Sequence, residues 1–240
     1  MVFLGEVEID ETNPNFIQAN VQSAEANLLI GRDAENLNAL QQVCRVILNK
    51  KLGQALVDKN MEYVKQLAKR QVDWGADVLD VNVGHPQIDE AEIIPMVVEA
   101  VKAAVDVPLC IDSNEPKILE AGLKAAPGKP LVNSVNGEEK QLAGVLPIVK
   151  DRGAAVIGLT IADEGIPPTA ELRLAAAGKI IERAVKMGIP IEDIIIDPLV
   201  MTVGHDFKAA TVTLKTIELI KKEYGVNMSL GASNVSFGLP

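Results

Sequence analysis

The sequence predicts an α/β fold with a parallel sheet, and three observations support this. Short apolar runs alternate with longer amphipathic segments along most of the 240 residues. Hydrophobic residues make up 48% of the chain but aromatic residues only 3%, which suits a core of Val, Ile, Leu and Ala better than a β-sandwich. Glycine follows several of the amphipathic segments, as is common just past the end of a helix.

Seven apolar runs bounded by turn residues are predicted to be strands. Runs of this length without polar alternation are typical of strands buried on both faces of a parallel sheet. In chain order they are NLLIG (27–31), DVLDVNVG (77–84), VPLCIDS (107–113), PLVNSVN (130–136), AAVIGLT (154–160), DIIIDP (193–198) and NMSLGASN (227–234).

Six segments between these runs carry a helical pattern, and four of them end in glycine. A glycine here can adopt the left-handed conformation that closes a helix. The helical segments are 60–76, 91–105, 115–126, 139–154, 170–188 and 207–225, and the glycines are Gly75, Gly153, Gly188 and Gly225.

Strict alternation of strands and helices gives right-handed βαβ units, which build either an open doubly wound sheet or a (β/α)₈ barrel. The first predicted strand is followed by IGRDAENLN rather than a glycine-rich phosphate loop, which favours the barrel. The prediction is a TIM barrel over residues 27–240 with its eighth βα unit missing from this chain. Residues 1–26 are interpreted as an N-terminal extension, with a short strand within 2–9 and a loop over 11–26.

Charge and composition exclude several classes of partner. The formal charge is −10 and we find no basic patch, so neither nucleic acid nor an anionic membrane is expected to bind. No apolar run approaches the roughly 18 residues of a membrane span, and the N-terminus is acidic rather than basic, so a cytoplasmic location is expected. His85 and His205 fall in loops without metal-ligand spacing, and Cys110 is expected to pack inside a strand. No metal site is predicted.

Polar side chains follow each apolar strand at its carboxyl end. In a barrel these ends surround one mouth, where the active site lies. The simpler interpretation is that each residue only caps the next helix or turn. The residues are Asp80 and Asn82, Asp112 and Ser113, Asn133 and Asn136, Thr160, Asp197, and Ser233 and Asn234.

The chemistry of this set favours a neutral heterocycle over a phosphate. It contains carboxylates and amides but no Lys or Arg. A carboxylate can accept two parallel N–H bonds from an amino-pyrimidinone edge, and an amide can satisfy adjacent donor and acceptor atoms. Pterins present such an edge.

The ordered motifs LDVNVG, LCIDS, LVNSVN, IGLT, IIDPL and GASNVSFGLP closely resemble the pterin-binding methyltransferases. This family includes methyltetrahydrofolate:corrinoid protein methyltransferases and the folate module of cobalamin-dependent methionine synthase. The resemblance runs from about residue 27 to the end, and it implies a pterin-binding barrel domain.

The resemblance also implies roles for individual residues. Asp112, Asn133 and Asp197 are expected to hold the pterin ring, and Asn234 to reach N5, the atom that bears the methyl group. Further candidates for substrate binding are Asn82, Asn136, Ser233 and Gly231.

The implied reaction moves a methyl group between methyltetrahydrofolate and the Co(I) corrinoid, or cobalamin, of a partner protein. No corrinoid-binding DxHxxG motif is present, so the corrinoid is expected to arrive on that partner. A homodimer is a family expectation. Two alternatives stay open: a dihydropteroate synthase-like enzyme, although the expected Lys and Arg are missing from the relevant loops, and a non-catalytic pterin-binding fragment.

Overall fold

The computed structural model of the protein describes residues 7–10, 18–21, 51–204, 207–231 and 234–235. Its main body is a six-stranded parallel sheet whose strands are neighbours in the same order as in the chain. The strands are β3 (Leu79–Val81), β4 (Leu109–Asp112), β5 (Leu131–Asn136), β6 (Ala155–Leu159), β7 (Ile194–Asp197) and β8 (Asn227–Met228).

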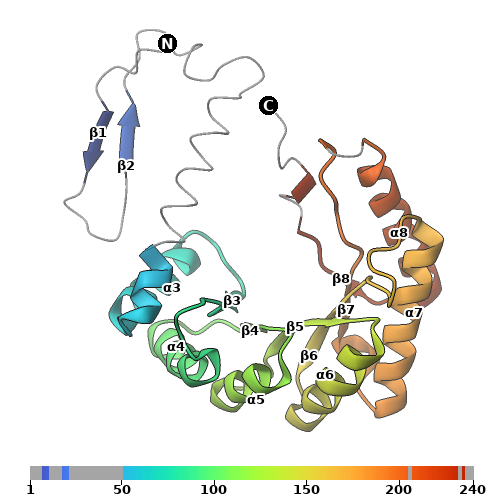
Figure 1. Cartoon of the computed structure of the whole chain (residues 1–240), viewed down its shortest axis with the longest axis horizontal. Helices are drawn as coiled ribbons and strands as arrows, with labels where there is room; N and C mark the ends of the chain where they lie inside the picture. Colours follow the sequence, from blue (N-terminus) through green and yellow to red (C-terminus); the bar gives the residue numbers. More distant parts are fainter. Residues whose placement is uncertain (1–6, 11–17, 22–50, 205–206, 232–233, 236–240) are drawn as a thin grey trace.

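The helices cover one side of this sheet, which curves so that the helices lie on its outer, convex side (Figure 1). Consecutive strand order with helices on one side is the arrangement of a barrel, whereas a doubly wound sheet reverses direction at a switch point. Among the described strands the barrel does not close, and β3 and β8 form the edges. The helices are α3 (Met61–Asp73), α4 (Glu90–Ala104), α5 (Pro116–Ala125), α6 (Glu139–Arg152), α7 (Ala170–Met187) and α8 (Ala209–Tyr224), with a 3₁₀ turn, η2 (Ile191–Asp193).

Alternation of buried and more exposed residues is clearest in β3 and β7. In β7, Ile194 and Ile196 are fully buried, while Ile195 and Asp197 are half-buried. Close helix–strand packing depends on glycine at a few points. A Cβ built on Gly122 of α5 would stand 2.8 Å from Cγ2 of Ile111, which places that β4 side chain under the helices.

Most predicted elements are confirmed. Six of the seven predicted strands form the sheet, the six predicted helices are present, and the four glycines expected after helices all have positive φ angles. The predicted strand at 27–31 lies outside the described residues. The predicted strand at 227–234 is much shorter in the structure, because ladder pairing with β7 ends at Met228.

The N-terminal prediction was wrong in one respect. Residues 18–21, expected to be part of a loop, form β2 (Gln18–Val21), which pairs antiparallel with β1 (Val7–Asp10). The sequence of β2, QANV, is too short and too polar to show strand character by itself, and its partner lies about ten residues earlier in the chain. Within the described part of the chain, no helix is long and apolar enough to cross a membrane.

Candidate functional site

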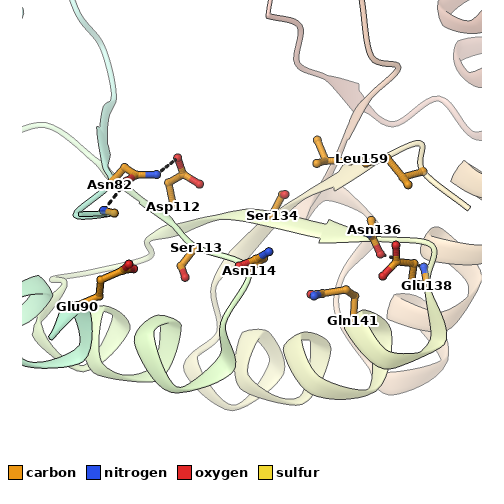
Figure 2. A pocket seen from close by; sticks show the side chains of 12 residues that line it. Asn82, Glu90, Asp112, Ser113, Asn114, Ser134, Asn136, Glu138, Gln141 and Leu159 are labelled. Carbon is orange, nitrogen blue, oxygen red and sulfur yellow. Dashed lines mark hydrogen bonds between the residues drawn. The ribbon is translucent and has the colours of Figure 1, made fainter. Parts of the chain in front are cut away.

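A cavity of about 510 Å³ opens over the carboxyl ends of β3 to β6. This volume suits a small organic molecule. Figure 2 shows the side chains around it, which come from strand ends, from the loops that follow them and from the first turns of α4 and α6. Its walls include Asn82, Asp112, Asn114, Ser134, Asn136 and Gln141.

Asn82 and Asp112 meet directly across this cavity wall. Nδ2 of Asn82 donates to Oδ2 of Asp112 over 2.8 Å, and Oδ1 of Asn82 accepts from the Gly84 N–H over 2.8 Å (Figure 2). The amide is therefore held at both ends. Its hydrogen bond engages Oδ2 of Asp112.

Burial raises the pKa of the Asp112 carboxyl, and the nearby Asp80 carboxylate raises it further. The hydrogen bond from Asn82 acts in the opposite direction. A carboxylate that is partly withdrawn from water gains more from a ligand that donates two N–H groups than a fully solvated one does. Asp112 is therefore well placed to bind such a ligand.

Asn133 and Asp80 form a second amide–carboxylate pair beside the first. Nδ2 of Asn133 donates to Oδ2 of Asp80 over 3.0 Å. Cys110 is buried, as predicted, and lies close enough to Asp80 and Asp112 for both carboxylates to act on its thiol. Burial and both carboxylates raise the pKa of its thiol well above the usual range, so it stays a protonated, unreactive group.

Strand β5 contains a bulge that shapes the same wall. Asn133 pairs with Ile157 and Val135 with Gly158, so Ser134 has no opposite residue in β6. Val132 and Val135 are both fully buried, and Asn133 and Asn136 are half-buried. The bulge inserts Ser134 into the cavity lining without changing which residues face the helices.

Asp197 ends β7 on the concave side. Its Oδ1 accepts from the Leu199 N–H over 2.7 Å. Burial raises the pKa of its carboxyl, and the bond from Leu199 lowers it in part. Asp197 pairs with Leu159 in the sheet, which in turn pairs with Asn136, so the three positions form one row across β5, β6 and β7.

A turn-type backbone hydrogen bond joins Gly231 and Asn234, two described residues beyond β8. The Asn234 N–H donates to the Gly231 carbonyl over 2.9 Å, and the Val203 N–H donates to the Val235 carbonyl over 3.1 Å. The second bond ties this turn to the loop that follows β7. Ser233 and His205 lie outside the described residues.

The structure therefore brings three predicted residues, Asn82, Asp112 and Asn136, to one cavity. Asn133 does not line the cavity but donates to Asp80, beside the Asn82–Asp112 pair. The cavity lining also lacks three predicted residues on or beyond strands β7 and β8, namely Asp197, Gly231 and Asn234. Sequence reasoning did not select Ser134 or Gln141, which do. Among described residues, no group of three His, Cys, Asp or Glu side chains could hold a metal ion.

The alternative interpretation of the strand-end residues is partly correct. Asn82, Ser113, Asn136 and Asp197 each accept a backbone N–H from two residues ahead, and so they stabilise local turns. Asp112 instead meets an amide from another strand. The same side chain can support a turn with one polar atom and present another to a ligand.

Comparison with known proteins identifies relatives over most of the chain. A family model described as pterin binding enzyme matches residues 49–240. The chain is 32% identical over 189 residues to the methylcorrinoid:tetrahydrofolate methyltransferase of Eubacterium limosum, which covers 78% of this chain and 70% of that protein. It is 30% identical over 202 residues to the methionine synthase of Mycobacterium tuberculosis, which covers 80% of this chain but 17% of that much longer protein.

Solved structures give the same fold at lower sequence identity. Dihydropteroate synthase from Stenotrophomonas maltophilia matches with a TM-score of 0.58 and 19% identity, over 72% of this chain and 67% of that one. The Yersinia pestis enzyme matches with a TM-score of 0.55 and 20% identity, over 71% of this chain and 66% of that one. These neighbours are TIM barrels, which agrees with the curved sheet described above. The family model and the similarity to the Eubacterium limosum methyltransferase show that the chain belongs to the pterin binding enzyme family.

Proposed function

We propose that the protein is a methyltransferase that moves a methyl group between N5 of methyltetrahydrofolate and the Co(I) corrinoid of a partner protein. The observation that carries this proposal is the array of Asp112, Asn133 and Asp197 at the carboxyl ends of three strands of one sheet. The similarity to a methylcorrinoid:tetrahydrofolate methyltransferase over most of the chain supports it.

The array suits the pterin ring for a chemical reason. Asp112 and Asp197 are partly buried carboxylates, each with one oxygen engaged in an internal hydrogen bond. The other oxygen of each can accept N–H groups from the ring. Asn133, fixed by Asp80 through one N–H, keeps its carbonyl oxygen and a second N–H for the ring's adjacent donor and acceptor. Asn82, Asn136, Gly231 and Ser233 remain proposed supporting residues.

Asn234 is proposed to act on the leaving group. The tertiary amine N5 is a poor leaving group unless a hydrogen bond or proton meets the negative charge that develops as its bond to the methyl carbon breaks. An amide that strengthens its bond to N5 in the transition state lowers this barrier. The corrinoid, as a co-substrate on the partner protein, would accept or supply the methyl group at the barrel mouth.

Ligand titration and a coupled assay test this proposal. The full chain should bind methyltetrahydrofolate in a calorimetric titration, and it should demethylate it when a corrinoid protein reduced to Co(I) is added. Binding without turnover, across several candidate corrinoid proteins, would support the non-catalytic alternative. No binding at all would overturn the proposal.

Dihydropteroate synthase activity is the second possibility. The similarity to solved dihydropteroate synthases is below 25% identity and supports the shared fold only. The loop after β7 reads PLVMTVGHDFK, and its one Lys, Lys208, is the residue directly before α8 rather than part of a glycine-rich, lysine-containing segment next to the strand. Condensation of a pterin pyrophosphate with p-aminobenzoate by this chain, in place of methyl transfer, would favour this alternative.

A further inference from the structure

Arg173 is a buried cation in the first turn of α7. It is only 3% exposed, and its described partners are backbone carbonyls rather than carboxylates. Nε donates to the Pro167 oxygen over 2.9 Å, and Nη1 donates to the Pro198 oxygen over 2.9 Å and to the Leu199 oxygen over 2.6 Å. Within the described residues it forms no ion pair. Burial lowers its pKa, as expected for a charge that is costly to remove from water.

Two of these carbonyls belong to the loop that follows Asp197. The Pro198 carbonyl and the Leu199 N–H are the two ends of a single peptide unit. Arg173 binds its oxygen end, and Oδ1 of Asp197 accepts from its N–H end over 2.7 Å. A cationic donor on the carbonyl polarises the peptide and makes its N–H a stronger donor. Arg173 thus acts on Asp197 through one peptide group.

The next peptide is held as well. Leu199 has a φ of 58°, in the left-handed region, where a branched residue stays only if its surroundings hold it. Its carbonyl accepts from Arg173 and also from Oγ1 of Thr213 in α8 over 2.9 Å. Side chains from two different helices therefore fix the loop that carries the Asp197 hydrogen bond.

We propose that Arg173 is a positioning residue of the pterin site. Through the Pro198–Leu199 peptide it fixes the Asp197 carboxylate, engages Oδ1 and leaves Oδ2 for the ligand. The ligand in this inference rests on the proposed function, but the coupling between Arg173 and Asp197 belongs to the free protein and can be measured without any ligand.

Three variants separate positioning from simple stability. Arg173→Lys keeps the charge but loses the planar fork that reaches two successive carbonyls. Thr213→Val removes the hydroxyl that holds the Leu199 carbonyl. Thr216→Val is the matched control, because Thr216 is equally buried on the same helix and its hydroxyl donates to the Val212 carbonyl within α8.

The main readout is the titration of the Asp197 carboxyl, followed by carbon-13 NMR in the free protein. The Leu199 N–H lowers the pKa of Asp197, so weakening that bond should raise it. We expect a clear rise in Arg173→Lys, a smaller rise in Thr213→Val and none in Thr216→Val. Tetrahydrofolate affinity, measured by calorimetry, should fall about tenfold in Arg173→Lys, the loss expected for a weakened charged hydrogen bond.

The inference is wrong if Arg173→Lys and Thr213→Val lower the melting temperature as Thr216→Val does but leave the Asp197 titration unchanged. If Arg173→Lys does not fold, the comparison of Thr213→Val with Thr216→Val decides. If the wild-type chain binds no tetrahydrofolate, the proposed function is wrong. The titration of Asp197 in the free protein then still tests whether Arg173 positions that carboxylate.

Discussion

Ligand binding and stability favour opposite protonation states of the Asp112 carboxyl: the proposed pterin site uses the ionised form, whereas the free folded protein is more stable with the protonated form. Burial raises its pKa above the value of 3.8 expected for an unfolded chain, so the folded state holds the proton more tightly than the unfolded state does. As the pH rises through this window the folded state loses stability relative to the unfolded state. The ionised carboxylate that the proposed pterin site requires therefore destabilises the free protein at neutral pH.

Asp112→Asn should consequently raise the melting temperature at pH 7 while weakening tetrahydrofolate binding more than about tenfold. The gain should shrink as the pH falls and vanish below 3.8, where the wild-type carboxyl is protonated in both states. Thermal unfolding across this pH range checks it. Asp163→Asn is a control of opposite sign, because the Lys179 side chain lowers the pKa of Asp163 and the variant should lose stability at pH 7. Equal melting temperatures for wild type and Asp112→Asn at every pH would contradict the account.

Asn234→Ala should lower turnover far more than tetrahydrofolate affinity, because its proposed bond to N5 strengthens only as the methyl carbon leaves. A loss of roughly a hundredfold in kcat is expected from removing one such donor. Steady-state kinetics with a reduced corrinoid protein, combined with equilibrium binding, separates the two effects. Similar losses in both would mean that Asn234 only orients the ring.

At the residue scale the sequence predicts which types of side chain gather, but not how they pair. Asn82 and Asp112 are 30 residues apart, and Asn133 and Asp80 are 53 apart. Their pairing depends on the register of adjacent strands, which no local pattern reports. The sequence did contain a pattern that predicts the burial of Arg173. Ala176, Ala177 and Ile180 follow it at spacings of three, four and seven residues, and all three are buried. Arg173 therefore lies on the core-facing side of an amphipathic helix.

At the scale of elements, the strand and helix periods were read correctly because apolar strands buried on both faces differ clearly from amphipathic helices. The errors fall at segments whose secondary structure depends on pairing with another segment. Residues 18–21 become a strand only beside residues 7–10, and the predicted strand at 227–234 pairs with β7 at two positions. The local sequence could predict neither the strand at 18–21 nor the short pairing of 227–234.

Gly122 and Gly144 give a paired test of helix–strand packing. Both lie within helices, so alanine brings the same gain in helix propensity of about 1 kcal/mol at each. A Cβ at Gly122 would stand 2.8 Å from Cγ2 of Ile111, a stiff core side chain, whereas a Cβ at Gly144 would stand 3.2 Å from Cγ of Pro116. Gly122→Ala should lower the free energy of unfolding by about 1–3 kcal/mol, as overpacking does, and Gly144→Ala should leave it unchanged or higher. Urea denaturation checks both, and equal effects would refute the packing argument.

The whole molecule carries a formal charge of −10, and Glu90, Asp112 and Glu138 line the cavity. Tetrahydrofolate is itself an anion at neutral pH because of its glutamate carboxylates. The approach of this proposed substrate is therefore opposed by the field of the protein, and added salt should screen that repulsion.

The association rate of tetrahydrofolate should accordingly rise, by about two- to threefold, between low and physiological ionic strength. Stopped-flow fluorescence at several salt concentrations measures it, with an uncharged pterin as the control whose rate should not change. A rate that falls with salt would show that local cations, rather than the overall charge, govern the encounter.

Because Ser134 lies in a bulge, β5 has one residue more than its pairing with β6 uses. Six residues of β5 lie opposite five of β6, and the partners on each side of Ser134 keep the alternation that a regular strand would have. A one-residue deletion there would leave every other ladder partner in place. Ser134 has no ladder partner in β6, but it lines the cavity. An insertion or deletion at this point is therefore expected to change the size of the cavity more than the pairing of β5 with β6.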